Sequence, residues 1–286
     1  MFGEQRRKQV VFFWFGLSLI CFFFAKVLYA TQIPHRIISL SPFITESLYL
    51  LGVQDKIVGT TIYDRNPGAE NRTKVGSIME INIEKVLSLS PDLILATDLT
   101  PVQEIQALRA RGFKVEVFSF WKSLDTLLNE FIRLGRLVGK AQKAKTIVKK
   151  IKNEISILNK KIQGLSKPKV IVEIGINPLW VAPRNSFIND YIELAGGINI
   201  APKKSGFISR EKILTLNPDV IIITDMGFEA EKEKRRWFQY HTLSAVQTKR
   251  IYIIDSDDLC SPTPPRFLKT LKLLIKLLHP EVGEQL

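Results

Sequence analysis

The chain has 286 residues, of which 45% are hydrophobic, and this length and composition indicate a globular protein of two domains rather than a disordered one. Its formal net charge is +13 at pH 7, but the basic residues are dispersed and no nucleic-acid-binding motif is recognisable. We therefore expect a lysine-rich, solvated surface and no nucleic-acid partner.

Residues 1–30 are typical of an export signal. Basic residues at 6–8 precede an apolar run, and the small residue Ala30 suits a cleavage point. The uncharged run is shorter than the ~20 residues of a membrane-spanning helix, so we expect a cleaved signal peptide, with an uncleaved anchor at residues 9–25 as the alternative. Lipidation of Cys21 is disfavoured because a large residue precedes it. Either alternative places the rest of the chain in the periplasm.

Residues 35–138 alternate short apolar segments with amphipathic ones, which predicts an N-terminal α/β lobe. Turns rich in glycine, proline and aspartate bound several of these segments. The expected strands lie at residues 36–42, 56–63 and 114–118, and the expected helices at 45–51, 102–111 and 124–138.

Residues 139–165 predict one long α-helix that joins two lobes. Its apolar side chains recur at alternating spacings of three and four, while the opposite face is mostly lysine. Such a helix is roughly 35–40 Å long and holds the parts that it connects at a fixed separation. The pattern also fits a coiled coil, and this alternative predicts an oligomeric, membrane-anchored scaffold.

Residues 168–286 continue the alternation of strands and helices and predict a C-terminal α/β lobe. Because such connections favour parallel sheets, a ligand is expected beyond the carboxyl ends of the strands, in a cleft between the lobes. The strands are expected at residues 169–174 and 250–255, the helices at 187–194 and 267–278, and a proline-rich loop at 257–266.

An internal repeat relates the two lobes. Residues 81–98 and 208–225 are identical at ten of eighteen aligned positions, and each copy predicts a short helix, a Pro-Asp turn and a buried strand. Glu84 and Glu211 occupy the same place in the two copies. A repeat of this length indicates two related, domain-sized halves rather than a solenoid.

Six stretches together carry a resemblance to a known family. They are residues 36–46 (RIISLSPFITE), 82–84 (NIE), 175–178 (GINP), 195–199 (AGGIN), 209–211 (SRE) and 265–266 (PR). Through them the chain resembles the periplasmic substrate-binding proteins of ABC transporters, in the helical-backbone class that carries corrinoids, haem and ferric siderophores. Within that class it is most similar to the cobalamin binders. The resemblance covers about residues 35–280 and implies an α/β fold: two lobes, each with a central, mostly parallel β-sheet flanked by helices, joined by one long backbone α-helix.

The resemblance also implies roles for five residues. Glu84 and Glu211 match a pair that docks onto arginines of the dimeric permease, one on each subunit, and two carboxylates suit two basic pockets. Tyr63, Trp180 and Asp258 match ligand contacts in the cleft, where aromatic rings stack on a planar macrocycle and a carboxylate binds its amide-rich rim. The alternative for the glutamates is a favourable place in the first turn of a helix, and for the other three it is ordinary packing or a loop carboxylate.

The function implied is that of the binding component of an ABC importer. We expect a monomer that captures cobalamin or a related corrinoid and delivers it to the permease dimer and its ATPase. Thr97, Ile78 and Pro262 stand where the cobalamin binders have tryptophan, tryptophan and arginine, so a ferric siderophore or haem is the alternative ligand. No cofactor other than the ligand is expected.

Enzymatic activity is not expected. The acidic residues Asp255, Asp257 and Asp258 fit a proline-flanked turn better than a catalytic site, and no serine-hydrolase, phosphate-loop or zinc-protease motif occurs. The three histidines are far apart in the sequence, which argues against a zinc site. Cys260 is the one cysteine after residue 30, so no internal disulfide is expected and its role is open.

Overall fold

The structure is a computed structural model, and it describes residues 33–77, 79–119, 122–225 and 229–285. The expected signal segment, with its alternative anchor at residues 9–25 and Cys21, lies outside the described residues. None of the described helices is long and apolar enough to cross a membrane. Residues 35–286 form one compact unit.

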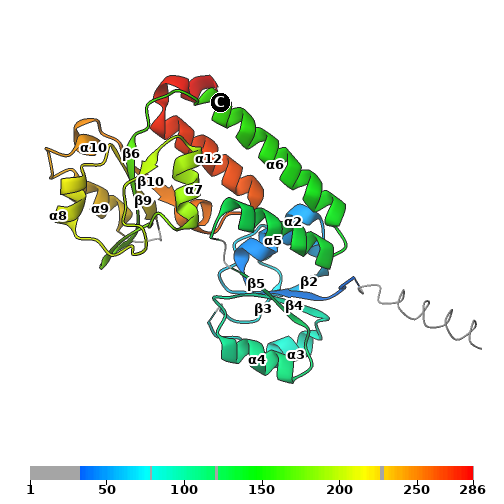
Figure 1. Cartoon of the computed structure of the whole chain (residues 1–286). Helices are drawn as coiled ribbons and strands as arrows, with labels where there is room; N and C mark the ends of the chain where they lie inside the picture. Colours follow the sequence, from blue (N-terminus) through cyan, green and yellow to red (C-terminus); the bar gives the residue numbers. More distant parts are fainter. Residues whose placement is uncertain (1–32, 78, 120–121, 226–228, 286) are drawn as a thin grey trace, which may run out of the picture. The chain divides into compact units, whose positions relative to one another are not determined.

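The N-terminal sheet consists of five parallel strands in the order β3-β2-β1-β4-β5. Helices cover both of its faces, so its strands are uninterrupted apolar runs. Leu93 and Leu95 pack in the core that includes α2 and α5, whereas Ile94 and Ala96 pack in a second core with α3 and α4 (Figure 1). Its elements are β1 Ile37–Ser39, α2 Pro42–Leu51, η1 Gln54–Lys56, β2 Ile57–Thr60, β3 Thr73–Lys74, α3 Ile83–Leu89, β4 Leu93–Thr97, α4 Val102–Ala110, β5 Val115–Phe118 and α5 Leu124–Leu137.

The C-terminal sheet has the order β10-β9-β6-β7, and β8 also pairs with β6. One face packs with α7, α11 and α12, and the other packs with α8, α9 and α10. Its elements are β6 Lys169–Ile176, β7 Leu179–Val181, α7 Phe187–Leu194, β8 Ile198–Asn199, α8 Arg210–Leu216, β9 Val220–Asp225, α9 Ala230–Trp237, α10 Ser244–Gln247, β10 Ile251–Asp255, α11 Ser256–Cys260, α12 Pro264–Leu278 and η2 Pro280–Gln285.

The expected fold class is confirmed: there are two mostly parallel sheets, each flanked by helices. The one departure from parallel pairing among the described strands is β7, which runs antiparallel to β6. Only two residues separate these strands, and so short a connection allows a hairpin but not a crossover. The division into separate lobes, at residues 35–138 and 168–286, stays a prediction.

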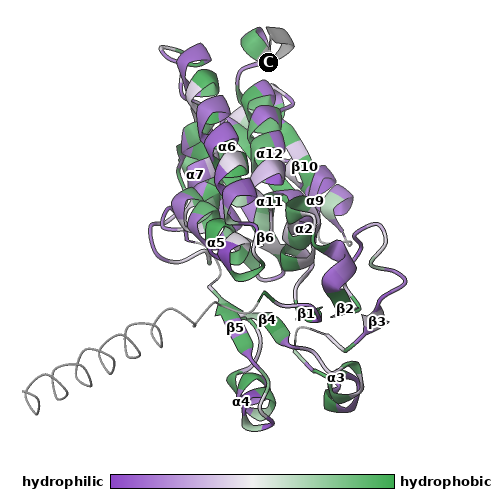
Figure 2. Cartoon of the chain, turned by 90° about the vertical axis from the view of Figure 1, so that its right-hand side faces the viewer, coloured by the Kyte–Doolittle hydropathy of each residue, from purple (hydrophilic) through white to green (hydrophobic). Residues whose placement is uncertain are grey.

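The long connecting helix is α6, Ala141–Lys161, and it follows α5 in the chain and precedes β6. It is shorter than the predicted 139–165 because Gly139 and Gly164 adopt left-handed backbone angles (φ 73° and 85°). Its apolar face contacts α5 and α12, so that face is buried within the chain and needs no coiled-coil partner. Its other face is hydrophilic, and Figure 2 shows hydrophilic and hydrophobic residues alternating along α6 and α12.

Residues 257–266 are not the proline-rich loop that the sequence predicts. Asp255 caps α11 by accepting a hydrogen bond from the backbone N–H of Asp257 at 2.7 Å. Helix α12 begins at Pro264, three residues earlier than expected, since proline is well suited to the first turn of a helix. Two helices therefore place the acidic residues and Arg266 in defined orientations.

Candidate functional site

A cavity of about 340 Å³ lies at the carboxyl ends of parallel strands. The segments that follow β1, β2 and β4 of the N-terminal sheet form one wall, and α11 and α12, which follow β10 of the C-terminal sheet, form the other. The cavity is lined by Ser41, Pro42, Phe43, Glu46, Tyr63, Arg65, Asn66, Pro67, Leu99, Asp257, Ser261 and Arg266. The sequence predicts a ligand beyond the carboxyl ends of the strands, and this cavity is the candidate site for it.

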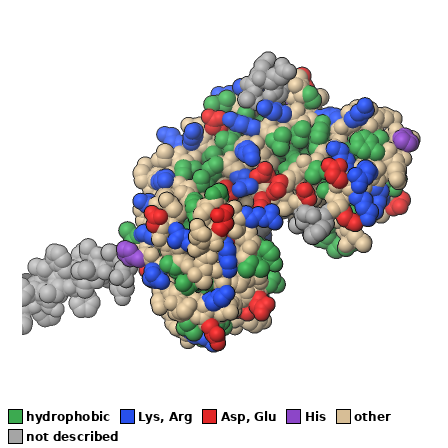
Figure 3. All heavy atoms as spheres, turned by 180° about the vertical axis from the view of Figure 1, so that it is seen from behind, with side chains coloured by type: hydrophobic (Ala, Val, Ile, Leu, Met, Phe, Trp, Pro, Cys, Tyr) green, Lys and Arg blue, Asp and Glu red, His purple; other side chains and the backbone are tan. Residues whose placement is uncertain are grey.

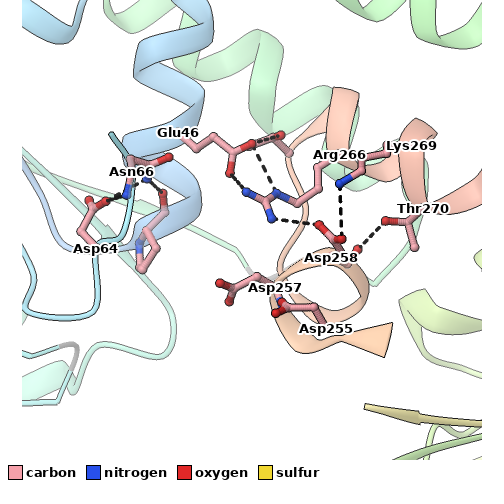
Figure 4. A network of polar contacts seen from close by, with 11 residues as sticks. Glu46, Asp64, Asn66, Asp255, Asp257, Asp258, Arg266, Lys269 and Thr270 are labelled. Atoms are coloured by element: carbon pink, nitrogen blue, oxygen red, sulfur yellow. Dashed lines mark hydrogen bonds and ion pairs between the residues drawn. The ribbon is translucent and has the colours of Figure 1, made fainter. Parts of the chain in front are cut away.

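An ion-pair network joins the two walls of the cavity (Figure 4). Arg266 of α12 donates from Nη2 to Oε2 of Glu46 on α2 at 2.9 Å, and from Nη1 to Oδ1 of Asp258 on α11 at 2.9 Å. The hydroxyl of Thr263 donates to the other oxygen of Glu46 at 2.9 Å. The network holds the guanidinium of Arg266 at the cavity surface between two carboxylates.

The three predicted ligand residues differ in where the structure places them. Tyr63 lines the cavity and is 57% exposed. Asp258 is not among the lining residues, because its carboxylate binds Arg266 and lies 3.7 Å from Nζ of Lys269. The preceding residue, Asp257, lines the cavity instead.

Trp180 is not among the lining residues either. It lies on β7, and its ring packs edge-on against Phe207 at a centroid distance of 4.2 Å. Gly206 lies so close to the indole that any side chain there would collide with it. Phe207 is 59% exposed, so the aromatic pair presents an apolar surface to solvent.

Sequence reasoning missed Arg65 and Asn66, both of which line the cavity. Asn66 is held by Asp64, whose Oδ1 accepts hydrogen bonds from the backbone N–H and the amide of Asn66 at 3.1 and 2.8 Å. The same amide donates to the carbonyl of Pro42 at 3.1 Å, which ties the loop to the start of α2. The signal that could have found them is an Asp-x-Asn turn after a buried strand, at the edge where ligands bind.

Glu84 and Glu211 occupy equivalent places in the structure. Each is the second residue of its helix, α3 or α8, and each side chain is exposed. The caps are equivalent too: Asn82 accepts from the N–H of Lys85 at 2.9 Å, and Ser209 from the N–H of Lys212 at 3.2 Å.

Glu211 is fully ionised at neutral pH. Hydrogen bonds from its own backbone N–H and from the hydroxyl of Ser209 lower the pKa of its carboxyl. Among the described residues, neither Glu211 nor Glu84 forms an ion pair. Both helices therefore present a carboxylate to solvent.

The charged surface is mixed on the face shown in Figure 3, where basic and acidic side chains alternate with apolar patches. Across residues 33–77, 79–119, 122–225 and 229–285, no group of three or more His, Cys, Asp or Glu side chains could hold a metal ion. Cys260 is a free thiol, and burial, followed by the charges of Asp257 and Asp255, raises its pKa to about 11. It is therefore protonated at neutral pH.

The family of the chain follows from residues 37–258, which match the model of the periplasmic binding protein family. This segment is most of the chain, and the chain belongs to that family. It is a substrate-binding protein of the ABC-transporter type and not an enzyme, and such proteins carry a ligand rather than a cofactor.

Three comparisons place the chain within the family. It is 29% identical over 263 residues to the uncharacterized ABC transporter substrate-binding lipoprotein YvrC of Bacillus subtilis, covering 88% of this chain and 82% of that protein. The periplasmic vitamin B12 binding protein BtuF of Vibrio cholerae is similar in structure, with a TM-score of 0.74 at 26% identity over 89% of this chain and 99% of that one. A possible iron-binding, periplasmic solute-binding protein of Staphylococcus epidermidis has a TM-score of 0.77 at 28% identity over 87% and 100%.

Proposed function

We propose that this protein captures cobalamin or a related corrinoid in the cavity between its two sheets and delivers it to an ABC permease. The observation that carries the proposal is the cavity itself, which lies at the carboxyl ends of strands and draws its walls from both halves of the repeat. Similarity to a vitamin B12 binding protein over nearly the whole of both chains supports the choice of ligand class.

The residues around the strand ends suit a large, partly apolar ligand. Ile62, Tyr63 and Leu99 follow β2 and β4 and are each more than half exposed (57%, 57% and 51%). Exposed apolar side chains grouped at one edge of a sheet are typical of a binding surface. A macrocycle would bury them, and Arg65 would supply hydrogen bonds to an amide-rich rim.

A ferric siderophore or haem is the second candidate ligand. Similarity to a possible iron-binding protein supports it, as does Arg65 in the cavity wall. A guanidinium group binds a carboxylate with bidentate geometry, so Arg65 could hold a carboxylate of an anionic iron chelate.

We also propose that Glu84 and Glu211 dock the protein onto the permease. Both carboxylates are exposed, lie in equivalent helix turns and are free of ion pairs with the described residues. Two matched carboxylates fix the register of a twofold symmetric partner as well as its rate of association. Exported protein in the periplasm would meet that partner at the membrane surface.

Tryptophan fluorescence tests the ligand. The chain is titrated with cyanocobalamin, haem and a set of ferric siderophores, alongside the variants Tyr63→Ala and Trp180→Phe. Saturable quenching by cobalamin that weakens at least about tenfold in Tyr63→Ala would support the proposal. Saturable quenching by an iron chelate, with no response to cobalamin, would instead support a role in iron uptake. A loss of the quenching amplitude in Trp180→Phe would show that Trp180 is near the ligand.

The docking proposal is tested with the double variant Glu84→Ala/Glu211→Ala. The permease and ATPase are reconstituted in lipid nanodiscs, and the stimulation of ATP hydrolysis is measured against the concentration of binding protein. The double variant is expected to lose stimulation while it binds ligand normally, because the substitutions lie outside the cavity. The control is Glu70→Ala, which removes an exposed carboxylate elsewhere. Equal stimulation by the variant and the unaltered protein would contradict docking by these residues.

A further inference from the structure

Arg210 immediately precedes Glu211, yet its guanidinium is turned into the protein. Its side chain is 17% exposed and donates from Nη1 to Oε1 of Glu233 on α9, a carboxylate that is 1% exposed. The guanidinium also lies over the ring of Trp237, 4.6 Å from its centroid. Both interactions favour an inward orientation of the charge.

Glu233 is the centre of this buried cluster. Its second oxygen accepts from Nη1 of Arg236 at 2.8 Å, so two guanidinium groups neutralise one carboxylate. Trp237, which is fully buried, donates from Nε1 to Oε1 of Glu173 on β6 at 2.8 Å. The cluster connects α8 to its neighbour α9 (Figure 1) and to the central strand of the sheet.

The other copy of the repeat has no such charge. Ile83 occupies the position of Arg210, is half-buried and packs at the edge of the core with α3 and α4. In neither copy does the residue before the docking glutamate direct a charged group into solvent, although the means differ. The N-terminal copy has an apolar side chain there, and the C-terminal copy has a guanidinium held inside by Glu233.

An outward-facing Arg210 would change the docking surface. Its guanidinium would add an exposed positive charge to the first turn of α8, which also carries Glu211. The guanidinium of Arg210 would compete with an arginine of the permease for the carboxylate of Glu211. It would also repel that arginine, because both carry a positive charge.

We propose that Glu233 is a positioning residue that sequesters Arg210 and thereby keeps this guanidinium from competing with a cationic partner for Glu211. The inference rests on the proposed docking role of Glu211. A purely structural ion pair between α8 and α9 is the competing explanation, and the titration of Glu211 distinguishes the two, because only a guanidinium released toward Glu211 changes the pKa of that carboxyl.

The test compares Glu233→Gln, Arg210→Met and the double variant Glu233→Gln/Arg210→Met, each in the full chain. In Glu233→Gln the released guanidinium is expected to weaken binding to the reconstituted permease and ATPase about 3- to 10-fold. The double variant is expected to regain binding within about twofold of the unaltered protein, because the interfering charge is gone. A double variant that binds as weakly as Glu233→Gln would overturn the proposal, since it no longer carries the guanidinium that Glu233 is proposed to sequester.

A second measurement does not depend on the permease. The carboxyl carbon of Glu211 is titrated by NMR in each variant. Arg210 already contributes to the lowered pKa of Glu211 from its inward position. Its release is expected to lower that pKa further in Glu233→Gln, whereas its deletion in the double variant is expected to raise the pKa above that of the unaltered protein. An unchanged titration in Glu233→Gln would show that the guanidinium stays inside and would overturn the proposal even if this variant is less stable.

Two controls separate the sequestration of Arg210 from the docking proposal. Glu116→Gln removes a carboxylate from another arginine ion pair, the more exposed one with Arg133, and is expected to leave docking unchanged. If Glu84→Ala/Glu211→Ala docks normally, the docking proposal fails. If that variant does not dock and the rescue by Arg210→Met is absent, only the sequestering role of Glu233 fails.

Discussion

At the scale of single residues, Glu173 is the clearest case of chemistry set by burial. It is 1% exposed on β6, and its Oε2 has no hydrogen-bond partner among the described residues. Burial, followed by the charge of Glu233, raises the pKa of its carboxyl to about 8 against an ordinary 4.5, even though Trp237 and two arginines favour the carboxylate. It is therefore protonated at neutral pH.

The stability of the protein should depend on pH through Glu173. Between pH 4.5 and 8 the unfolded chain releases this proton while the folded chain keeps it, so folding stability falls as pH rises through that range. Relative to Glu173→Gln, the unaltered protein is expected to lose up to about 1.4 kcal/mol for each pH unit. Urea unfolding of both proteins at pH 5, 6, 7 and 8 measures the difference. The exposed substitution Glu70→Gln serves as the control, and parallel curves for Glu173→Gln and the unaltered protein would refute the prediction.

Arg266 should contribute to stability as well as to the cavity wall. Arg266→Met leaves Glu46 without an ion pair and leaves Asp258 with only the exposed Lys269, and the side chains of these two carboxylates are 23% and 20% exposed. We expect a loss of about 1–3 kcal/mol in the free energy of unfolding, because an unpaired, half-buried charge keeps its desolvation cost. Chemical denaturation gives the value.

The matched control is Lys269→Met. Lys269 faces the same Asp258 at 3.7 Å but is 77% exposed, and solvent screens an ion pair of this kind. Its loss is expected to stay within about 0.5 kcal/mol. Equal losses in the two variants would show that the ion pairs of Arg266 are no stronger than a surface contact.

At the scale of elements, α6 shows how a local pattern becomes tertiary packing. Its buried residues are Ala144, Val148, Ile151, Ile155 and Leu158, which recur at spacings of three and four. Gly135 of α5 permits a close approach, because a Cβ at that position would lie 2.5 Å from Cβ of Ala144. The two helices thus pack more tightly than larger residues would allow.

Two isoleucines of α6 provide a matched test of this packing. Ile155 is 6% exposed within the core, and Ile157 is 52% exposed on the opposite side. Ile155→Ala is expected to cost about 2–4 kcal/mol in the free energy of unfolding, since it leaves a cavity, whereas Ile157→Ala should change it by less than about 0.5 kcal/mol. Guanidinium denaturation measures the free energy of unfolding of both variants. A loss for Ile157→Ala as large as that for Ile155→Ala would contradict the burial of only one face of α6.

At the scale of the whole molecule, the two sheets share one continuous core. Leu95 of the N-terminal sheet and Val172 of the C-terminal sheet belong to the same buried cluster, together with the inner face of α6. Hydrogen bonds also connect the two halves: the backbone N–H of Leu124 donates to the carboxylate of Asp190 at 2.7 Å. These connections oppose a large rotation of one half against the other.

Small-angle X-ray scattering should therefore detect little closure on ligand binding. The radius of gyration with and without a saturating ligand is expected to agree within about 0.5 Å, unlike that of binding proteins with flexible hinges. The ligand that saturates fluorescence quenching is the one to use. A compaction of several ångströms would show that α6 and the shared core permit a hinge.

The sequence by itself determined the features that depend on neighbours in the chain. The periodicity of residues 139–165 predicted α6, and the repeat predicted that Glu84 and Glu211 occupy equivalent turns, because helices, caps and Pro-Asp turns are local. Only the tertiary structure decided that Asp257 and not Asp258 lines the cavity, since a one-residue step in a helix turns a side chain by about 100°. Contacts between residues distant in sequence could not be predicted either. Arg266 binds Glu46 across 220 positions, and Arg210 turns inward because α9 places Glu233 next to it.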